Sequence, residues 1–345
     1  MSKIKNNVVI PIFIPHKGCP FDCIFCNQRK ICGYCLEPSL EQIKEIIDKH
    51  LSTIKQGTNV EIGFFGGSFT GIDEDLQIAY LETANKYVID NKVKSIRIST
   101  RPDYITDHVL SYLKNYNVKL IELGVQSMHD DVLRASRRGH TVEDVINSAQ
   151  LIKQKGIKLG VQVMAGLPES TRQKDIATAE LCVSLMPDVA RIYPTLVVKD
   201  TYLEKLYING MYRPLVLKEA VDICAEMLKV FRSNNVNVIR IGLQPTEDIN
   251  EKAEVVAGPF HPSFRQLVES KLVFDKISQY LINHDLNKYN IVVIATDKNN
   301  MSYVAGQKKE NIIKLKEIFN LKKVIIVDEE KYRGYNDEST LIVKI

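Results

Sequence analysis

Three cysteines near the start of the chain have the spacing of a metal-binding loop. Cys19, Cys23 and Cys26 form a C-x3-C-x2-C pattern shortly after an apolar run that ends at Ile14. Three thiolates on one short loop can ligate three irons of a [4Fe–4S] cluster, which leaves the fourth iron without a protein ligand. Because an open metal position is where chemistry takes place, the pattern predicts a reactive iron–sulfur centre on this loop.

Two further cysteines, Cys32 and Cys35, follow closely and keep a zinc alternative open. Zinc sites favour C-x2-C pairs, and Cys23 and Cys26 with Cys32 and Cys35 would make a four-cysteine zinc site. The x3-x2 spacing and the position after a predicted strand favour the iron–sulfur interpretation. The role of Cys32 and Cys35 stays open between an auxiliary metal or redox pair, inert thiols and an aid to cluster assembly.

The composition is that of an ordinary globular protein. Of the 345 residues 45% are hydrophobic and 26% are charged, which excludes collagen-like and disordered classes. The net charge of +4 is too small an excess to identify a nucleic-acid partner by itself. No apolar run is long enough for a membrane span, and the N-terminus has no cleavage signal. We therefore expect a cytoplasmic protein, whose clustered thiols hold metal and do not form disulfides.

Apolar runs rich in β-branched residues alternate with helical patterns up to about residue 243. One helical stripe begins at Ile43 and follows Ser39 and Gln42, which have the arrangement of a capping box. Buried strands separated by helices predict a parallel sheet, and six or more such units favour a barrel or partial barrel with its active-site groups at the carboxyl ends of the strands. The predicted strands are Val8–Ile14, Val60–Phe65, Val93–Ser99, Val118–Gln126, Ile157–Met164, Val189–Val198 and Val236–Leu243.

The pattern changes after residues 258–262, which contain two prolines. A long amphipathic helix is predicted from Phe264 to Leu281, and a strand, a lysine-rich helix from about Lys308 and two further strands follow it. We therefore divide the chain into a core of residues 1–258 and a small C-terminal αβαββ appendage of residues 259–345.

Six more motifs follow the cysteine loop, mostly at the ends of predicted strands. Together with the C-x3-C-x2-C loop they resemble the radical SAM superfamily, and within it the oxygen-independent coproporphyrinogen oxidases and the radical domain of the Elongator catalytic subunit, a tRNA wobble-uridine modifier. The run from Tyr193 to Val197 resembles the second group specifically. The resemblance covers roughly residues 8 to 245 and implies a partial (β/α)6-type TIM barrel. The six motifs are Gly63–Thr70, Arg97–Tyr104, Glu122–Ser127, Arg137–Thr141, Gly166–Pro168 and Arg191–Thr201.

The resemblance also implies two cofactors and the residues that hold them. A [4Fe–4S] cluster on the three cysteines would bind S-adenosylmethionine (SAM) and cleave it reductively to a 5′-deoxyadenosyl radical. Phe25 stands where the superfamily commonly places an aromatic residue. Gly66 and Gly67 occupy the segment that holds the methionyl amino group.

Four further positions are assigned to SAM by the same resemblance. Gln126 and Arg138 are expected to contact it through the ribose and the carboxylate, for which an arginine fork is suited. Gln162 stands where other members carry an acidic or imidazole group. Ser99 replaces a glutamate of the coproporphyrinogen oxidases, and this difference speaks against heme-precursor activity.

We therefore expect an enzyme that acts by radical SAM chemistry on a substrate of which tRNA or another RNA is the favoured class. An electron donor such as flavodoxin or ferredoxin would reduce the cluster. Nothing after residue 258 resembles the R-x-x-G-x-G/A loop of the Elongator acetyltransferase, so acetyl transfer is not expected. The alternatives are a coproporphyrinogen oxidase-like tetrapyrrole enzyme, and a non-catalytic RNA-binding or heme-carrying protein with a structural cluster.

Overall fold

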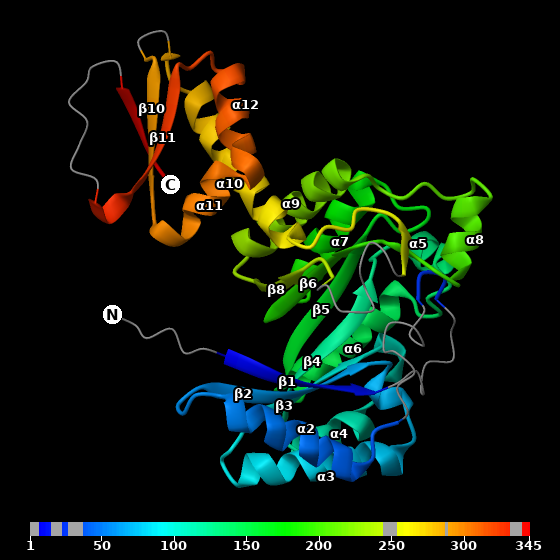
Figure 1. Cartoon of the computed structure of the whole chain (residues 1–345). Coiled ribbons are helices and arrows are strands. Elements are labelled where there is room, and N and C mark those ends of the chain that lie inside the picture. The colour runs from blue at the N-terminus through cyan, green and yellow to red at the C-terminus, as the bar shows by residue number, and fades with distance from the viewer. Residues whose placement is uncertain (1–6, 15–22, 27–36, 244–253, 287–288, 332–339) are drawn as a thin grey trace.

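Seven parallel strands form one curved sheet in the computed structural model of the chain (Figure 1). The structure describes residues 7–14, 23–26, 37–243, 254–286, 289–331 and 340–345. The sheet is an open half-barrel, which confirms the predicted partial (β/α)6-type TIM barrel. In the order in which they pair, the strands are β1 (Asn7–Ile14), β2 (Asn59–Gly66), β3 (Ser95–Thr100), β4 (Val118–Gln126), β5 (Lys158–Ala165), β6 (Val189–Pro194) and β8 (Asn237–Ile241).

One main helix lies between each pair of successive strands and covers the convex face of the sheet (Figure 1). The first of them begins at the predicted capping box, in which Gln42 N donates to Ser39 Oγ at 3.2 Å and Ser39 N donates to Gln42 Oε1 at 2.8 Å. The helices are α2 (Leu40–Thr53), α3 (Glu74–Ile89), α4 (Asp107–Asn115), α6 (Val142–Gln154), α7 (Arg172–Ser184) and α9 (Leu217–Ser233).

Alternation along the strands gives the two faces of the sheet different chemistry. Ile12, Ile62 and Ile98 are fully buried in the large core shared with the helices. Successive side chains of a strand point to opposite faces, so the concave face receives their neighbours, among them Phe13 and Arg97. The convex side is therefore apolar, whereas the concave side carries charged groups and an exposed aromatic ring.

The predicted strand Val189–Val198 is wrong in its second half. The strand β6 ends at Pro194, and a short strand β7 (Val197–Val198) pairs antiparallel with β9 (Val255–Ala257) outside the main sheet. Proline has no N–H to donate to a ladder. Thr195 then uses both its N–H and its hydroxyl on the carbonyl of Ala165, at 2.9 and 2.8 Å, which ties the departing chain to the end of β5.

The C-terminal segment forms a second, smaller sheet in the order β11-β10-β12, and its strands are all parallel. The helix α10 takes part in two cores, because Phe264 and Val268 pack in the core of the half-barrel whereas Ile277 and Leu281 pack under the small sheet. The elements are α10 (Phe264–Ile282), β10 (Ile291–Thr296), α11 (Met301–Ala305), α12 (Glu310–Ile318), β11 (Lys323–Asp328) and β12 (Thr340–Lys344).

One difference in detail concerns the lysine-rich helix of this segment. The lysine-rich helix α12 begins at Glu310 and not at Lys308, because Lys308 and Lys309 have positive φ angles of 51° and 64°. Among the described residues no helix combines the length and the apolar character that a membrane crossing requires.

Candidate functional site

Two neighbouring cysteines of the predicted cluster loop lie in a tight turn. Cys26 N donates to Cys23 O at 2.9 Å, which closes a four-residue turn. The Cys23 side chain is buried and that of Cys26 is half-buried. Cys19, Cys32 and Cys35 lie outside the described residues, so the structure gives the position of two of the three predicted iron ligands.

A small apolar cluster anchors this turn between two helices, α5 (Asp130–Ala135) and α8 (Tyr202–Ile208). Ile24 is fully buried against Val197 and Leu203, and the predicted cofactor residue Phe25 packs half-buried against the same cluster. Backbone hydrogen bonds hold Ile24 from both sides. Ile24 N donates to Ser136 O at 3.2 Å, and Leu203 N donates to Ile24 O at 2.8 Å. The residues between the two cysteines, Ile24 and Phe25, therefore carry the packing of the turn.

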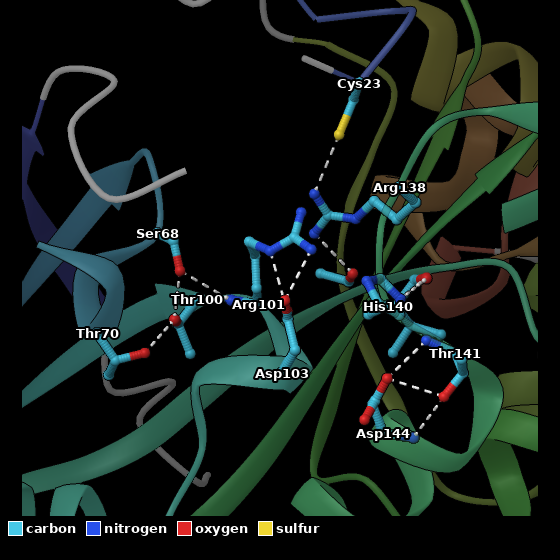
Figure 2. Close-up of polar contacts among 12 residues, drawn as sticks. Cys23, Ser68, Thr70, Thr100, Arg101, Asp103, Arg138, His140, Thr141 and Asp144 are labelled. Carbon is cyan, nitrogen blue, oxygen red and sulfur yellow. Dashed lines mark hydrogen bonds and ion pairs between the residues drawn. The ribbon is translucent and has the colours of Figure 1, made fainter. Parts of the chain in front are cut away.

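Arg138 joins the cysteine turn to the end of β4 (Figure 2). Its Nη1 donates to Cys23 Sγ at 3.4 Å and its Nη2 donates to Gly124 O at 3.0 Å. Gly124 is required for this geometry, since a Cβ atom there would lie 2.7 Å from Arg138 Nη2. The guanidinium is 7% exposed and forms no ion pair with a carboxylate among the described residues. A buried, unneutralised cation therefore lies beside a predicted iron ligand.

The strand β4 ends in a strained turn at Gln126. The φ angle of Gln126 is 66°, and Ser127 N donates to Val125 O at 2.9 Å across it. Such a three-residue turn with a positive central φ is rare and strained, and strain of this kind concentrates at functional sites. The Gln126 side chain is 5% exposed, and its Oε1 has no hydrogen-bond partner within the described part of the chain.

His140 lies behind the same strand end and provides a second unpaired acceptor. Its Nε2 lies 3.3 Å from Val125 O, and its Nδ1 has no partner among the residues that the structure describes. Burial lowers the pKa of the imidazole to about 3, and the charges of Arg138 and Arg101 contribute to this shift. The ring is therefore neutral and donates its one N–H to the carbonyl, which leaves Nδ1 as a bare acceptor.

The glycine pair after β2 packs against the end of β1. Gly66 has a φ of +111°, and a Cβ atom there would lie 2.4 Å from Ile14 O. Gly67 N donates to the same carbonyl at 3.1 Å. Only glycine allows this close approach, which places the backbone of the pair at the point where the chain leaves β1 for the cysteine loop.

Hydroxyl groups and an ion pair brace the neighbouring strand end (Figure 2). Thr100 Oγ1 lies 2.8 Å from Ser68 Oγ and 2.5 Å from Thr70 Oγ1, and Arg101 N donates to Ser68 Oγ at 3.2 Å. Arg101 is buried and binds both carboxylate oxygens of Asp103 at 2.9 Å. These bonds hold the ends of β2 and β3 in register beside Arg138.

The remaining two predicted positions, Ser99 and Gln162, are half-buried on the concave face of the sheet. Gln162 pairs in register with Gly124 on one side and with Arg191 on the other. Ser99 pairs in register with Glu122. Both residues therefore lie below the strand ends at which Gln126, Arg138 and His140 meet.

The unpaired atoms at the end of β4 test whether SAM fits here. Leaving a buried polar atom unsatisfied costs about 1–3 kcal/mol, and three of them gather here: Gln126 Oε1, His140 Nδ1 and Arg138 Nε. SAM offers ribose hydroxyls as donors to the two acceptors and a carboxylate as partner for the guanidinium. The residues present therefore fit this cofactor.

Sequence reasoning assigned no role to two residues of this site, His140 and Arg101. His140 belongs to the Arg137–Thr141 motif, and Arg101 to the Arg97–Tyr104 motif, so both were in recognised segments. A signal for His140 was available, because a histidine next to an assigned arginine is a candidate ligand contact. Its burial and its unpaired nitrogen could be seen only in the folded chain.

Comparisons with known proteins agree with this geometry. The radical SAM superfamily model matches residues 13–182, and the model of the radical SAM C-terminal domain matches residues 187–273. A tRNA uridine(34) acetyltransferase of Methanocaldococcus jannaschii is 30% identical over 196 residues, which cover 51% of this chain and 36% of that protein. An uncharacterized protein of the same organism is 30% identical over 243 residues, 66% of this chain and 73% of that protein.

The chain spans about a third of the length of the two Methanocaldococcus tRNA uridine(34) acetyltransferases that it matches. Among solved structures, an N-terminally truncated Elp3 of the archaeon Methanocaldococcus infernus superposes with a TM-score of 0.63 at 21% sequence identity, over 80% of this chain and 64% of that one. This likeness shows a shared fold. With both family models matched along the half-barrel and into α10, the chain belongs to the radical SAM superfamily.

Proposed function

We propose that this protein cleaves SAM reductively with a [4Fe–4S] cluster held by Cys19, Cys23 and Cys26, and that its substrate is an RNA of the tRNA class. When bound, the cluster and SAM supply a 5′-deoxyadenosyl radical that abstracts hydrogen from the substrate. The observation that carries the proposal is the bond from Arg138 to Cys23. It joins a predicted SAM residue to a predicted iron ligand at the carboxyl ends of the strands.

The residues of the chain would hold SAM by complementing its polar groups. Gln126 and neutral His140 offer acceptors to the ribose hydroxyls, and the Arg138 guanidinium offers its free N–H to the carboxylate. The Gly66–Gly67 segment would lie beside the methionyl amino group of SAM. Because these groups are buried and braced, they need little reorganisation when the ligand binds.

The tRNA class is supported by the activity of two relatives and by the region over which this chain is similar to them. The relatives of known activity modify tRNA uridine, and this chain is similar to them over the half-barrel. These relatives are longer than the matched region. Our proposal therefore covers the radical step alone and includes no acetyl transfer.

Anaerobic reconstitution tests the proposal. We expect the purified protein to take up iron and sulfide, to give the spectrum of a reduced four-iron cluster with dithionite, and to release 5′-deoxyadenosine from SAM. Zinc in place of iron and sulfide would favour the four-cysteine zinc site on Cys23, Cys26, Cys32 and Cys35. A cluster that forms but never cleaves SAM would favour the non-catalytic alternative.

The substrate class needs a separate test. Total tRNA added to the reduced enzyme should speed SAM cleavage and should acquire a modified nucleoside detectable by mass spectrometry of its digest. An enzyme that cleaves SAM equally with and without tRNA, and that leaves every nucleoside unchanged, would refute the RNA part of the proposal while the radical chemistry stands.

A further inference from the structure

The concave face of the half-barrel carries an exposed aromatic pair at its edge. Phe13 on β1 and Phe65 on β2 are register partners, and their ring centroids are 6.5 Å apart at an interplanar angle of 49°. Phe13 is 54% exposed, although it lies within β1, next to its carboxyl end at Ile14. Since β1 is an edge strand of the open sheet (Figure 1), this ring faces the side from which a substrate can enter.

Two glycines make room for the groups beside this pair. A Cβ atom at Gly63 would lie 2.5 Å from Phe65 Cε2, so the Phe65 ring lies back over the bare backbone of its own strand. A Cβ atom at Gly160 would lie 2.8 Å from Glu122 Cγ. With no side chain on this part of β5, Arg191 reaches across from β6 to Glu122 on β4.

Arg191 also contacts the aromatic pair, through the ring of Phe65. Its guanidinium carbon lies 5.0 Å from the centroid of the Phe65 ring, and its Nη1 donates to Tyr193 Oη at 3.4 Å. A cation against one face of an aromatic ring stabilises it in place. Tyr193 is thereby linked to the aromatic pair through Arg191.

Four charged residues in the middle of this face, Arg97, Arg191, Glu61 and Glu122, pair with one another. Arg97 binds Glu122 through Nε at 3.0 Å and Nη2 at 2.7 Å and binds Glu61 through Nη1 at 3.3 Å, while Arg191 forms its own ion pair with Glu122. Two arginines therefore meet two glutamates. A ligand with several carboxylates, such as a porphyrinogen, would need cations that these pairs already occupy. The face suits a flat ring that is polar at its edge but uncharged.

We propose that Phe13 and Phe65 form a stacking platform for a nucleobase of the RNA substrate, and that Tyr193 and Gln162 contact the polar edge of the base. The proposal rests on the proposed function, because it names where that substrate lies. Bases stack on exposed aromatic side chains with little dependence on sequence. The platform lies at the carboxyl ends of β1 and β2, next to the glycine pair, so a stacked base would be held beside SAM.

The sequence contains no tryptophan, which allows a direct test. Phe13→Trp places a single indole at the platform, and Tyr207→Trp places one on α8, where Tyr207 is also exposed, as the matched control. We expect single-stranded oligouridylate to quench the Phe13→Trp fluorescence saturably and to leave the Tyr207→Trp fluorescence unchanged. An abasic oligonucleotide of equal length should quench neither. Equal quenching by the abasic strand, or no quenching at position 13, would overturn the platform.

A second variant covers the case that the indole disturbs the strand. Phe13→Leu keeps an apolar side chain but lacks a ring, so we expect oligouridylate to bind about tenfold more weakly in filter binding, at an affinity that Phe13→Tyr restores. Unchanged affinity of Phe13→Leu would refute the platform. These titrations require no turnover. A failure of the platform is therefore distinguishable from a failure of the proposed function, in which the wild-type enzyme would release no 5′-deoxyadenosine.

Discussion

The convex face and the carboxyl edge of the seven-stranded sheet differ in how their buried groups are paired. On the convex face Ile12, Ile62 and Phe64 are completely buried among helices, and the buried thiol of Cys182 has a pKa raised by burial to about 12. At the carboxyl edge Cys23 is also buried, but an arginine donates to its sulfur, and polar atoms without a partner among the described residues lie at the adjoining end of β4. Among the described residues the first region has its polar groups paired or absent, whereas the second keeps buried polar atoms without a partner, as the proposed cofactor site requires.

The two buried thiols give the sharpest test of this comparison. We expect Cys23→Ala to lose the iron–sulfur cluster and all SAM cleavage, because three thiolates are needed to hold the cluster. Cys182→Ala should keep both, since that thiol is inert packing. Iron and sulfide content after anaerobic reconstitution and the yield of 5′-deoxyadenosine measure the effect. Full iron content in Cys23→Ala would break the comparison.

Substitutions on the convex face should lower the stability of the fold. Phe64→Ala removes a fully buried ring and should lower the free energy of unfolding by about 4 kcal/mol. Phe64→Leu should cost much less, because it retains most of the apolar volume. Urea denaturation of the apoprotein measures both. A small loss of unfolding free energy in Phe64→Ala would mean that the carboxyl edge of the sheet, and not this core, determines stability.

The pH dependence of stability should reveal the neutral histidine at the edge. The pKa of His140 in the folded chain is lowered to about 3, so below about pH 6.5 the unfolded chain takes up a proton that the folded chain does not. Between pH 7 and pH 4 the wild type should therefore lose about 3 kcal/mol of stability more than His140→Gln loses. His108→Gln, at an exposed position, should behave as the wild type. Parallel pH curves of the wild type and His140→Gln would contradict this account.

The smallest expected effect is at Arg138. Arg138→Met should weaken SAM binding about thirtyfold, equivalent to about 2 kcal/mol for a lost charge-assisted bond. It should also lower the reduction potential of the cluster, because hydrogen bonds to the sulfurs help to set that potential. Arg172→Met, which removes an exposed ion pair on α7, is the matched control. Calorimetry and a spectroscopic redox titration measure the two effects, and an unchanged potential would separate Arg138 from the cluster.

Much of the fold could be predicted, because strand and helix patterns are local. The β-branched runs, the capping box at Ser39 and the glycine pair at Gly66 and Gly67 report on short stretches of backbone, and all lie where they were expected. The end of β6 was placed wrongly because the turn away from the sheet depends on Thr195 bonding the distant carbonyl of Ala165. Apolar character continues through Val197 and Val198, so the pattern alone shows no break.

The sequence alone predicts a type of chemistry, because the cysteine spacing suits a three-thiolate cluster and the motifs place candidate residues at strand ends. Only the tertiary structure decided how these residues act together. Cys23 and Arg138 are 115 positions apart, and the unpaired state of Gln126 and His140 depends on which neighbours bury them. The same holds for Phe13, whose exposure follows from its place on an edge strand of an open sheet. Local patterns predict elements, whereas partners and exposure result from packing between elements far apart in the chain.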